Sequence, residues 1–183
     1  MRVRRNNTDL SEIVSEVVRK IGVKPSQTVL DYGCGPGTYI IPLASVVNSQ
    51  GKVYALDKDR AALDSLMRKA DSTGLANIIR LDTAGGTQIP LANDSIDVVL
   101  LFDVFHDYYF SSAAERQDLL CEISRVLRLD GLLSVFPKHM ETEARSEIES
   151  AGFILEDKLS TNLIHDGSDL ERGHILNFKK LIA

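Results

Sequence analysis

The sequence has no tryptophan and few cysteine, proline and aromatic residues. Its 183 residues include 2 cysteines, 5 prolines and 6% aromatic side chains. So few cysteines exclude a scaffold held together by disulfides. Cys34 and Cys121 lie far apart in the chain, without the spacing of a zinc site. We therefore interpret both as reduced thiols, which predicts a cytoplasmic protein without a metal site.

Long apolar runs and an excess of positive charge are also absent. No run of ~18 apolar residues is present, so we expect no membrane span. The basic start, Met1–Arg5, is not followed by the apolar segment of a signal peptide. The net charge of −5 disfavours nucleic acid as a partner. A short basic patch at Arg2, Arg4 and Arg5 is the local exception.

The composition and the hydrophobic periodicity are those of a globular protein. Apolar residues make up 44% of the chain and charged residues 26%, and we expect residues 1–183 to form a single domain. Short apolar segments alternate with amphipathic ones. The predicted strands cover residues 28–31, 52–56, 77–81, 96–102, 132–136, 153–159 and 175–179. The predicted helices cover about 9–21, 39–47, 61–70, 113–127 and 141–150.

This order of elements predicts an α/β fold with a Rossmann-like, doubly wound sheet of seven strands. Alternating strands and helices produce a parallel sheet with helices on both faces, and right-handed crossovers determine its topology. No helix separates the last two strands, so we expect Ser160–Gly173 to be a loop that joins an antiparallel pair. Ligands of such sheets bind at the carboxyl ends of the strands.

A glycine-rich loop follows the first predicted strand, with glycines at Gly33, Gly35 and Gly37. Glycine permits positive φ and a close approach of the backbone to a ligand. The loop leads into a helix N-terminus, whose free amides favour an anionic group. Its spacing, G-x-G-x-G, is not the G-x-G-x-x-G of dinucleotide-binding proteins, because Thr38 stands where that pattern has its last glycine.

Two acidic residues end the next two strands. Asp57 ends the second strand, where a carboxylate can accept hydrogen bonds from both hydroxyls of a ribose. It could instead cap the following helix, although Asp59 is placed equally well for that role. Asp82 ends the third strand, where it could receive the amino group of an adenine or be a solvated loop residue.

Candidate catalytic residues follow the fourth strand. His106 is the best candidate for a general base, because an imidazole titrates near neutral pH. Asp103 or Asp107 could orient it or bind a substrate. The alternative is that His106 packs the loop. An aromatic wall could be formed by Tyr108, Tyr109 and Phe110.

The other chemically reactive side chains can be explained by packing or by exposure to solvent. Cys34, inside the glycine loop, is expected to be a small buried residue and Cys121 a core residue of its helix. Lys138 and His139 follow the fifth strand, where they could meet an acidic group of a substrate or remain solvated.

Four segments in this order resemble class I S-adenosylmethionine-dependent methyltransferases, most closely the ubiquinone/menaquinone-biosynthesis-like branch. They are Val29–Gly37, Asp57 with its strand, Ile89–Asp97 and Glu122–Gly131. The resemblance implies S-adenosylmethionine as the cofactor. It implies that the methionine part is held by Asp31 and the Gly33–Gly37 backbone with Cys34, the ribose by Asp57 beside Lys58, and the adenine near Asp82 and Thr83. Phe102 and Asp103 would lie beside the reactive methyl group.

The resulting prediction is a methyltransferase that acts on a small-molecule acceptor. Two alternatives stay open: an NAD- or nucleotide-binding oxidoreductase, and a non-catalytic module that binds S-adenosylmethionine. Little sequence is inserted after the fifth strand, so we expect the first helix or a second subunit of a homodimer to cover the substrate pocket. The acceptor atom is not predicted.

Overall fold

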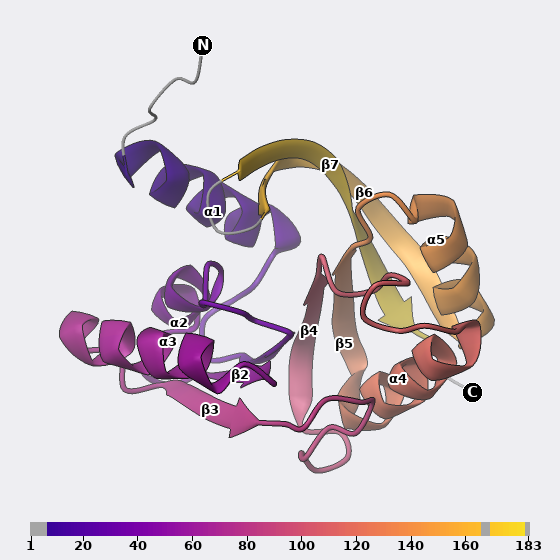
Figure 1. The fold of residues 1–183 in the computed structure, drawn as a ribbon, viewed down its shortest axis with the longest axis horizontal. Coiled ribbons are helices and arrows are strands. Elements are labelled where there is room, and N and C mark those ends of the chain that lie inside the picture. The colour runs from indigo at the N-terminus through magenta and orange to yellow at the C-terminus, as the bar shows by residue number, and fades with distance from the viewer. Residues whose placement is uncertain (1–6, 166–168, 182–183) are drawn as a thin grey trace.

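The protein has three layers, with one sheet between two layers of helices (Figure 1). The computed structural model describes residues 7–165 and 169–181. Its helices are α1 (Asn7–Ile21), α2 (Ile40–Val47), α3 (Arg60–Thr73), α4 (Ala113–Val126) and α5 (Glu141–Ser150). Its strands are β1 (Thr28–Tyr32), β2 (Lys52–Asp57), β3 (Ile78–Asp82), β4 (Ile96–Phe102), β5 (Leu127–Phe136), β6 (Phe153–His165) and β7 (Asp169–Lys180).

The seven strands form a single sheet with the order β3-β2-β1-β4-β5-β7-β6. Strands β1 to β5 pair in parallel, and β7 pairs antiparallel with both β5 and β6. The predicted fold class is confirmed. The chain order reverses between the neighbours β1 and β4, and ligands of open α/β sheets bind at such a point.

Apolar side chains on the two faces of the sheet build two separate cores. Val29 of β1 packs with the helices α1, α2 and α3, whereas the next residue, Leu30, packs with α4 and α5. Successive side chains of a strand point to opposite faces. A strand covered on both faces must therefore be apolar at nearly every position, as β4 is. This explains why its bounds agree with the prediction.

Local signals set several helix ends. The Asp59 carboxylate accepts hydrogen bonds from the amides of Ala61 and Ala62, which confirms it as the N-cap of α3. Gly22, with φ of 85°, ends α1. The same helix begins at Asn7, slightly before the predicted start. Within the described ranges, no helix is long and apolar enough to cross a membrane.

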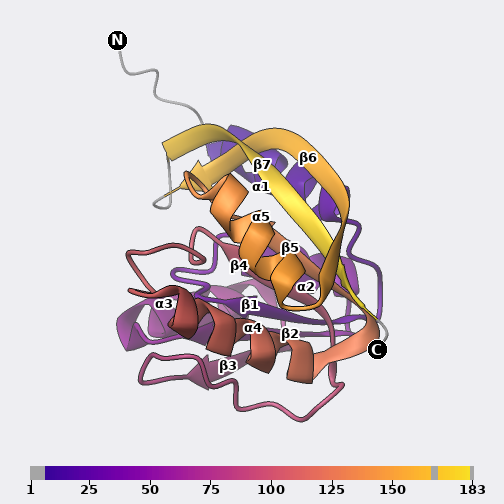
Figure 2. The same ribbon diagram turned by 90° about the vertical axis from the view of Figure 1, so that its right-hand side faces the viewer.

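Two predictions about the second half of the chain are wrong. Most of the predicted loop Ser160–Gly173 belongs to β6 and β7, whose hairpin extends to α1 (Figure 2). Thr161 and Leu163 are buried while Ser160 and Asn162 are exposed, so the side chains alternate here as in a strand, up to Ile164, which is also buried. Cys121 is exposed, because the buried stripe of α4 passes through its neighbours and leaves this position on the outer side of the helix.

Candidate active site

Two adjoining cavities lie at the carboxyl ends of β1, β2 and β4. The first has a volume of about 370 Å³, and its lining includes Asp57, Lys58 and Thr83. The second, of about 330 Å³, includes Asp31, Phe102 and Asp103 in its lining. They share four lining residues, namely Gly33, Gly35, Val104 and Tyr109. The structure thus brings most of the predicted site residues into one continuous site.

The glycine loop lies between the cavities in a conformation that favours glycine. Its three glycines, Gly33, Gly35 and Gly37, have φ of 75°, 52° and 80°. The amides of Gly33 and Cys34 both donate to the Leu56 carbonyl, which joins the loop to β2. Gly37 serves packing, because a Cβ there would lie 2.4 Å from a methyl group of Leu66 in α3. A Cβ at Gly33 would likewise lie 2.5 Å from a methyl group of Val104, whereas no atom lies within 4 Å of the Cβ position of Gly35, whose backbone is accessible from both cavities.

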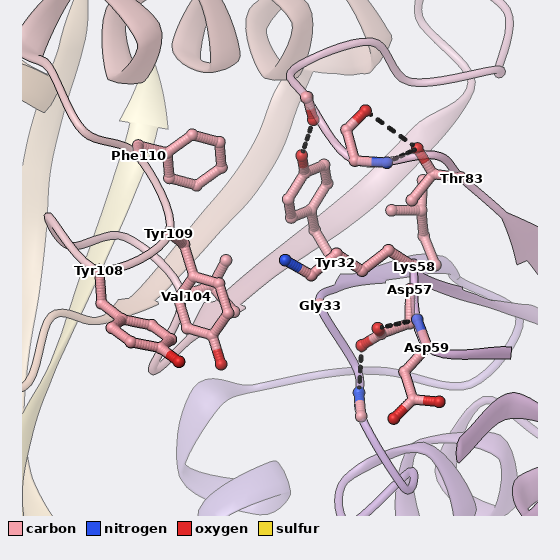
Figure 3. A pocket seen from close by; sticks show the side chains of 14 residues that line it. Tyr32, Gly33, Asp57, Lys58, Asp59, Thr83, Val104, Tyr108, Tyr109 and Phe110 are labelled. Carbon is pink, nitrogen blue, oxygen red and sulfur yellow. Dashed lines mark hydrogen bonds between the residues drawn. The ribbon is translucent and has the colours of Figure 1, made fainter. Parts of the chain in front are cut away.

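The Asp57 carboxylate is held by two backbone amides (Figure 3). Oδ2 accepts from the Gly35 amide at 2.7 Å, and Oδ1 accepts from the Asp59 amide at 2.8 Å. A carboxylate oxygen has two lone pairs, so each still has one acceptor position. Asp57 thus fixes the glycine loop and presents a carboxylate to the first cavity.

Asp31 places a buried carboxyl group in the second cavity. The residue is 4% exposed, and no hydrogen bond joins its carboxyl group to another side chain in the described part of the chain. Burial, together with the negative charge of the neighbouring Asp57, raises its pKa to about 7. A carboxylate in this position is stabilised by a cation that enters the cavity.

Aromatic rings and the β6–β7 hairpin wall the second cavity. Tyr39 and Phe102 meet edge to face with ring centroids 4.9 Å apart, and Phe136 lies beyond Phe102. The Ile164 amide, near the end of β6, donates to the Tyr39 hydroxyl at 3.2 Å. This hydrogen bond joins the hairpin to the N-cap of α2 and places Ile164 in the cavity wall.

Asp103 and His106 lie on the loop after β4. Asp103 has a φ of 56°, and its amide donates to the Phe136 carbonyl. Its Oδ1 lies 3.6 Å from Nζ of Lys138 and 3.5 Å from Nε2 of His106. Asp103 therefore faces the second cavity with two basic groups beside it.

The His106 ring is buried and contacts the backbone of its own loop. Its Nδ1 accepts from the Tyr108 amide at 3.3 Å, and its Nε2 lies 3.2 Å from the Asp103 carbonyl oxygen. Burial lowers its pKa below the usual value, and the charge of Asp103 opposes this effect. The geometry fits the loop-packing alternative, and the role of a general base stays a prediction.

Of the remaining predicted residues, Thr83 and Cys34 line a cavity, whereas Asp82 does not. Thr83 lines the first cavity and accepts a hydrogen bond from the Gly85 amide, whereas buried Cys34 lines the second. Asp82 is exposed and bound by the Arg80 guanidinium, which lowers the pKa of this carboxyl group. Its predicted contact with adenine therefore competes with an existing ion pair and stays a prediction.

Sequence reasoning missed several residues of the site. Tyr32 ends β1 and donates its hydroxyl hydrogen to the Gly86 carbonyl, which ties the loop after β3 to the first cavity (Figure 3). Tyr39 lies close to the glycine loop in the sequence, and this position could have identified it as a residue of the site. The sequence contains no such indication for Ile164, because only the bend of the hairpin brings it to the cavity.

Comparison with known proteins agrees with this geometry. The family model described as "Methyltransferase domain" matches residues 30–135, which is more than half of the chain. The chain belongs to this methyltransferase family. The resemblance to class I S-adenosylmethionine-dependent methyltransferases of the ubiquinone/menaquinone-like branch is thereby confirmed. S-Adenosylmethionine is accordingly the cofactor of this methyltransferase domain.

Individual relatives are distant. The chain is 28% identical over 124 residues to a demethylmenaquinone methyltransferase of Lactobacillus johnsonii, covering 68% of this chain but only 49% of that protein. It is 29% identical over 147 residues to a probable cobalt-precorrin-6B C(15)-methyltransferase (decarboxylating) of Saccharolobus solfataricus, covering 78% and 69%. The chain therefore spans about half the length of the first relative. A crystal structure of an S-adenosylmethionine-dependent methyltransferase from Aquifex aeolicus has the same fold, with a TM-score of 0.79 at 23% identity over 96% of this chain and 94% of that one.

The residues of the two cavities fit this cofactor. Asp31 is a buried acid placed to receive a cation, as the ammonium group of a methionine moiety requires. Asp57 keeps acceptor positions for the two hydroxyls of a ribose. The first cavity has apolar and aromatic walls beyond Asp57, formed in part by Leu56 and Phe110, as a planar base requires.

Proposed function

We propose that this methyltransferase transfers a methyl group from S-adenosylmethionine to a small-molecule acceptor. The observation that carries the proposal is the position of Asp31. This buried carboxyl group lies beside Asp57 at the glycine loop, in a cavity that continues into aromatic walls. The relatives named demethylmenaquinone methyltransferase and cobalt-precorrin-6B methyltransferase support an acceptor of small size.

In this proposal the chain mainly binds and orients the reactants. S-Adenosylmethionine, when bound, supplies a methyl group activated by a sulfonium sulfur. Asp31 binds the ammonium group, and Asp57 binds the ribose while it holds the Gly35 amide in place. Orientation of two reactants contributes up to ~7–11 kcal/mol to catalysis in the best cases. The rigid hydrogen bonds of the glycine loop serve this purpose.

The acceptor occupies the aromatic part of the second cavity. Phe102, Phe136 and Ile164 exclude water there and favour an acceptor with an apolar body. Asp103 also lines this cavity, and we propose that it positions the acceptor or receives its proton. His106, through its contact with the Asp103 carbonyl, holds the loop on which this carboxylate lies.

The charge of the chain bears on the kind of acceptor that it takes. The net charge of −5 supports a small molecule rather than nucleic acid as the acceptor. A homodimer and a cytoplasmic location stay predictions. Light scattering at micromolar protein concentration tests the homodimer directly.

Calorimetric titration tests the function. We expect S-adenosylmethionine and its demethylated product, S-adenosylhomocysteine, to bind with micromolar dissociation constants, and NADH not to bind. Detection of S-adenosylhomocysteine during incubation with candidate acceptors then measures turnover. Binding of NADH alone would overturn the proposal in favour of the oxidoreductase. Cofactor binding with no turnover of any acceptor would favour the non-catalytic module.

Replacement of His106 by alanine is expected to reduce turnover by roughly tenfold or more, because Asp103 loses the contact that holds its loop. The dissociation constant for S-adenosylmethionine should change less than about twofold, since His106 lines neither cavity in the described part of the chain. The pH dependence of turnover separates the two roles. A general base gives an acidic limb that disappears in His106→Ala, whereas loop packing leaves the limb in place. Full activity in His106→Ala would contradict both the role of general base and the role in holding the loop.

A further inference from the structure

The two cavities meet at a small set of residues. Gly33, Gly35, Val104 and Tyr109 line both of them. The inference below rests on the proposed function, in which the adenosine part occupies the first cavity and the methionine part the second. The sulfonium group joins these two parts of the cofactor, so it lies at the junction of the cavities. Among the four shared residues, Tyr109 alone has an aromatic ring.

The face of the Tyr109 ring already accepts a cation. Nζ of Lys58 lies 5.7 Å from its centroid, and Figure 3 shows the Lys58 side chain extending across the first cavity toward the ring. The His106 and Tyr108 rings are its neighbours, each with its centroid 5.1 Å from that of Tyr109. Tyr109 is 47% exposed, so a ligand in the cavity can reach it.

We propose that the Tyr109 ring is the specificity-determining contact for the positively charged sulfonium group. A cation over an aromatic face is attracted by the negative potential of the ring. S-Adenosylhomocysteine carries a neutral thioether at the same place, so it gains only dispersion from this contact. The ring therefore favours the substrate form of the cofactor over its product form. Because both are cations, the Lys58 ammonium leaves the ring when the sulfonium group arrives.

Replacement of Tyr109 separates the charge effect from simple packing. We expect Tyr109→Leu to weaken S-adenosylmethionine binding by about five- to thirtyfold and to change S-adenosylhomocysteine binding less than about twofold. Tyr109→Phe, which keeps the aromatic face, should stay within about threefold of the parent for both ligands. Sinefungin, which carries a protonated amine in place of the sulfonium group, should follow S-adenosylmethionine. All three ligands are titrated calorimetrically at constant ionic strength.

Two further variants complete the design. Tyr108→Leu is the matched control. The Tyr108 ring lies on the same loop and lines the first cavity but not the second, so its replacement should change both affinities by the same factor. Lys58→Gln removes the competing cation and should strengthen binding of S-adenosylmethionine, but not of S-adenosylhomocysteine, by about threefold. Circular dichroism melting verifies that each variant is folded.

The outcomes separate the two proposals. An unchanged ratio of the two dissociation constants in Tyr109→Leu, with both ligands bound, overturns the role of Tyr109 and leaves the methyltransferase proposal standing. If Lys58→Gln leaves the ratio of the two dissociation constants unchanged, the proposed displacement of the Lys58 ammonium group is contradicted. If the parent protein binds neither ligand, both the proposed function and this inference fail.

Discussion

Replacement of Asp31 by asparagine is expected to stabilise the ligand-free protein at pH 8 and to weaken S-adenosylmethionine binding by about a hundredfold. Both effects follow from a carboxylate that is 4% exposed and lacks a cationic partner in the described chain. The charged group is costly to bury, so its removal lowers the free energy of the folded state. The same charge attracts the ammonium group of the cofactor, so its removal weakens binding by ~2.7 kcal/mol, the equivalent of a hundredfold.

The sign of the pH dependence follows from the direction of the pKa shift. The pKa of Asp31 in the folded protein is about 7, whereas an unfolded aspartate titrates near ~3.9. The folded state therefore holds an extra proton between these values, and this residue makes stability fall as the pH rises through that window. Above pH 7 the penalty is up to ~4 kcal/mol, and it disappears below about pH 4. Asp31→Asn should abolish this dependence.

Cofactor binding has the opposite pH dependence, because only the carboxylate attracts the cation. We expect S-adenosylmethionine to bind the parent protein about tenfold more weakly at pH 6 than at pH 8, with release of a proton on binding near neutral pH. Titration calorimetry in two buffers of different ionisation enthalpy measures that proton, and urea unfolding at pH 4 and pH 8 measures stability. A variant that is less stable at pH 8 and binds with undiminished affinity would contradict both arguments.

Replacement of Asp57 by alanine should weaken binding of S-adenosylmethionine and S-adenosylhomocysteine alike, by about a hundredfold. The variant loses the carboxylate proposed to accept both ribose hydroxyls, and a hydrogen bond to a charged group contributes ~1.5–3 kcal/mol. It also releases the Gly35 and Asp59 amides from their shared acceptor, which loosens the glycine loop. Equal effects on both ligands distinguish this residue from Tyr109, because the ribose is common to the two.

Titration of folded Asp57→Ala with both ligands tests this placement. Asp71→Ala is a suitable control, because it removes an exposed carboxylate from the far end of α3 and should leave binding unchanged. Asp57→Asn adds a finer test, since an amide keeps one acceptor oxygen and should recover part of the affinity. Unchanged affinity in Asp57→Ala would contradict the placement of the ribose beside Asp57 in the first cavity.

The first half of the fold was largely predictable because its signals are local. The loop from Gly33 to Gly37 and the acids Asp31, Asp57 and Asp59 lie next to strand ends in the sequence, where parallel topology brings them together. The bounds of β4 were predicted without error, because burial on both faces requires a continuous apolar run. These features depend on residues only a few positions apart.

The wall of the second cavity was not predictable in this way. Residues 160–173 have no apolar run long enough to indicate a strand, and Thr161 and Leu163 are buried in the part of the sheet where β6 contacts α1. Ile164 and Tyr39 are joined across 125 positions of sequence by one hydrogen bond, and no local pattern encodes such a pairing. The prediction for Cys121 failed because neighbours on a helix lie about 100° apart, so the buried face depends on which side meets the sheet.

The sequence by itself determined the methyltransferase fold, the glycine loop and the acids at the strand ends. Strand ends and glycine conformations are set by local backbone preferences, which the sequence carries directly. Only the tertiary structure decided that Asp31 is buried without a cationic partner in the described chain, that the hairpin contributes Ile164 to the wall of the second cavity, and that Tyr109 lies at the junction with Lys58 beside it. Burial, charge compensation and ring contacts depend on distances between residues far apart in sequence, and the packing of the whole chain sets those distances.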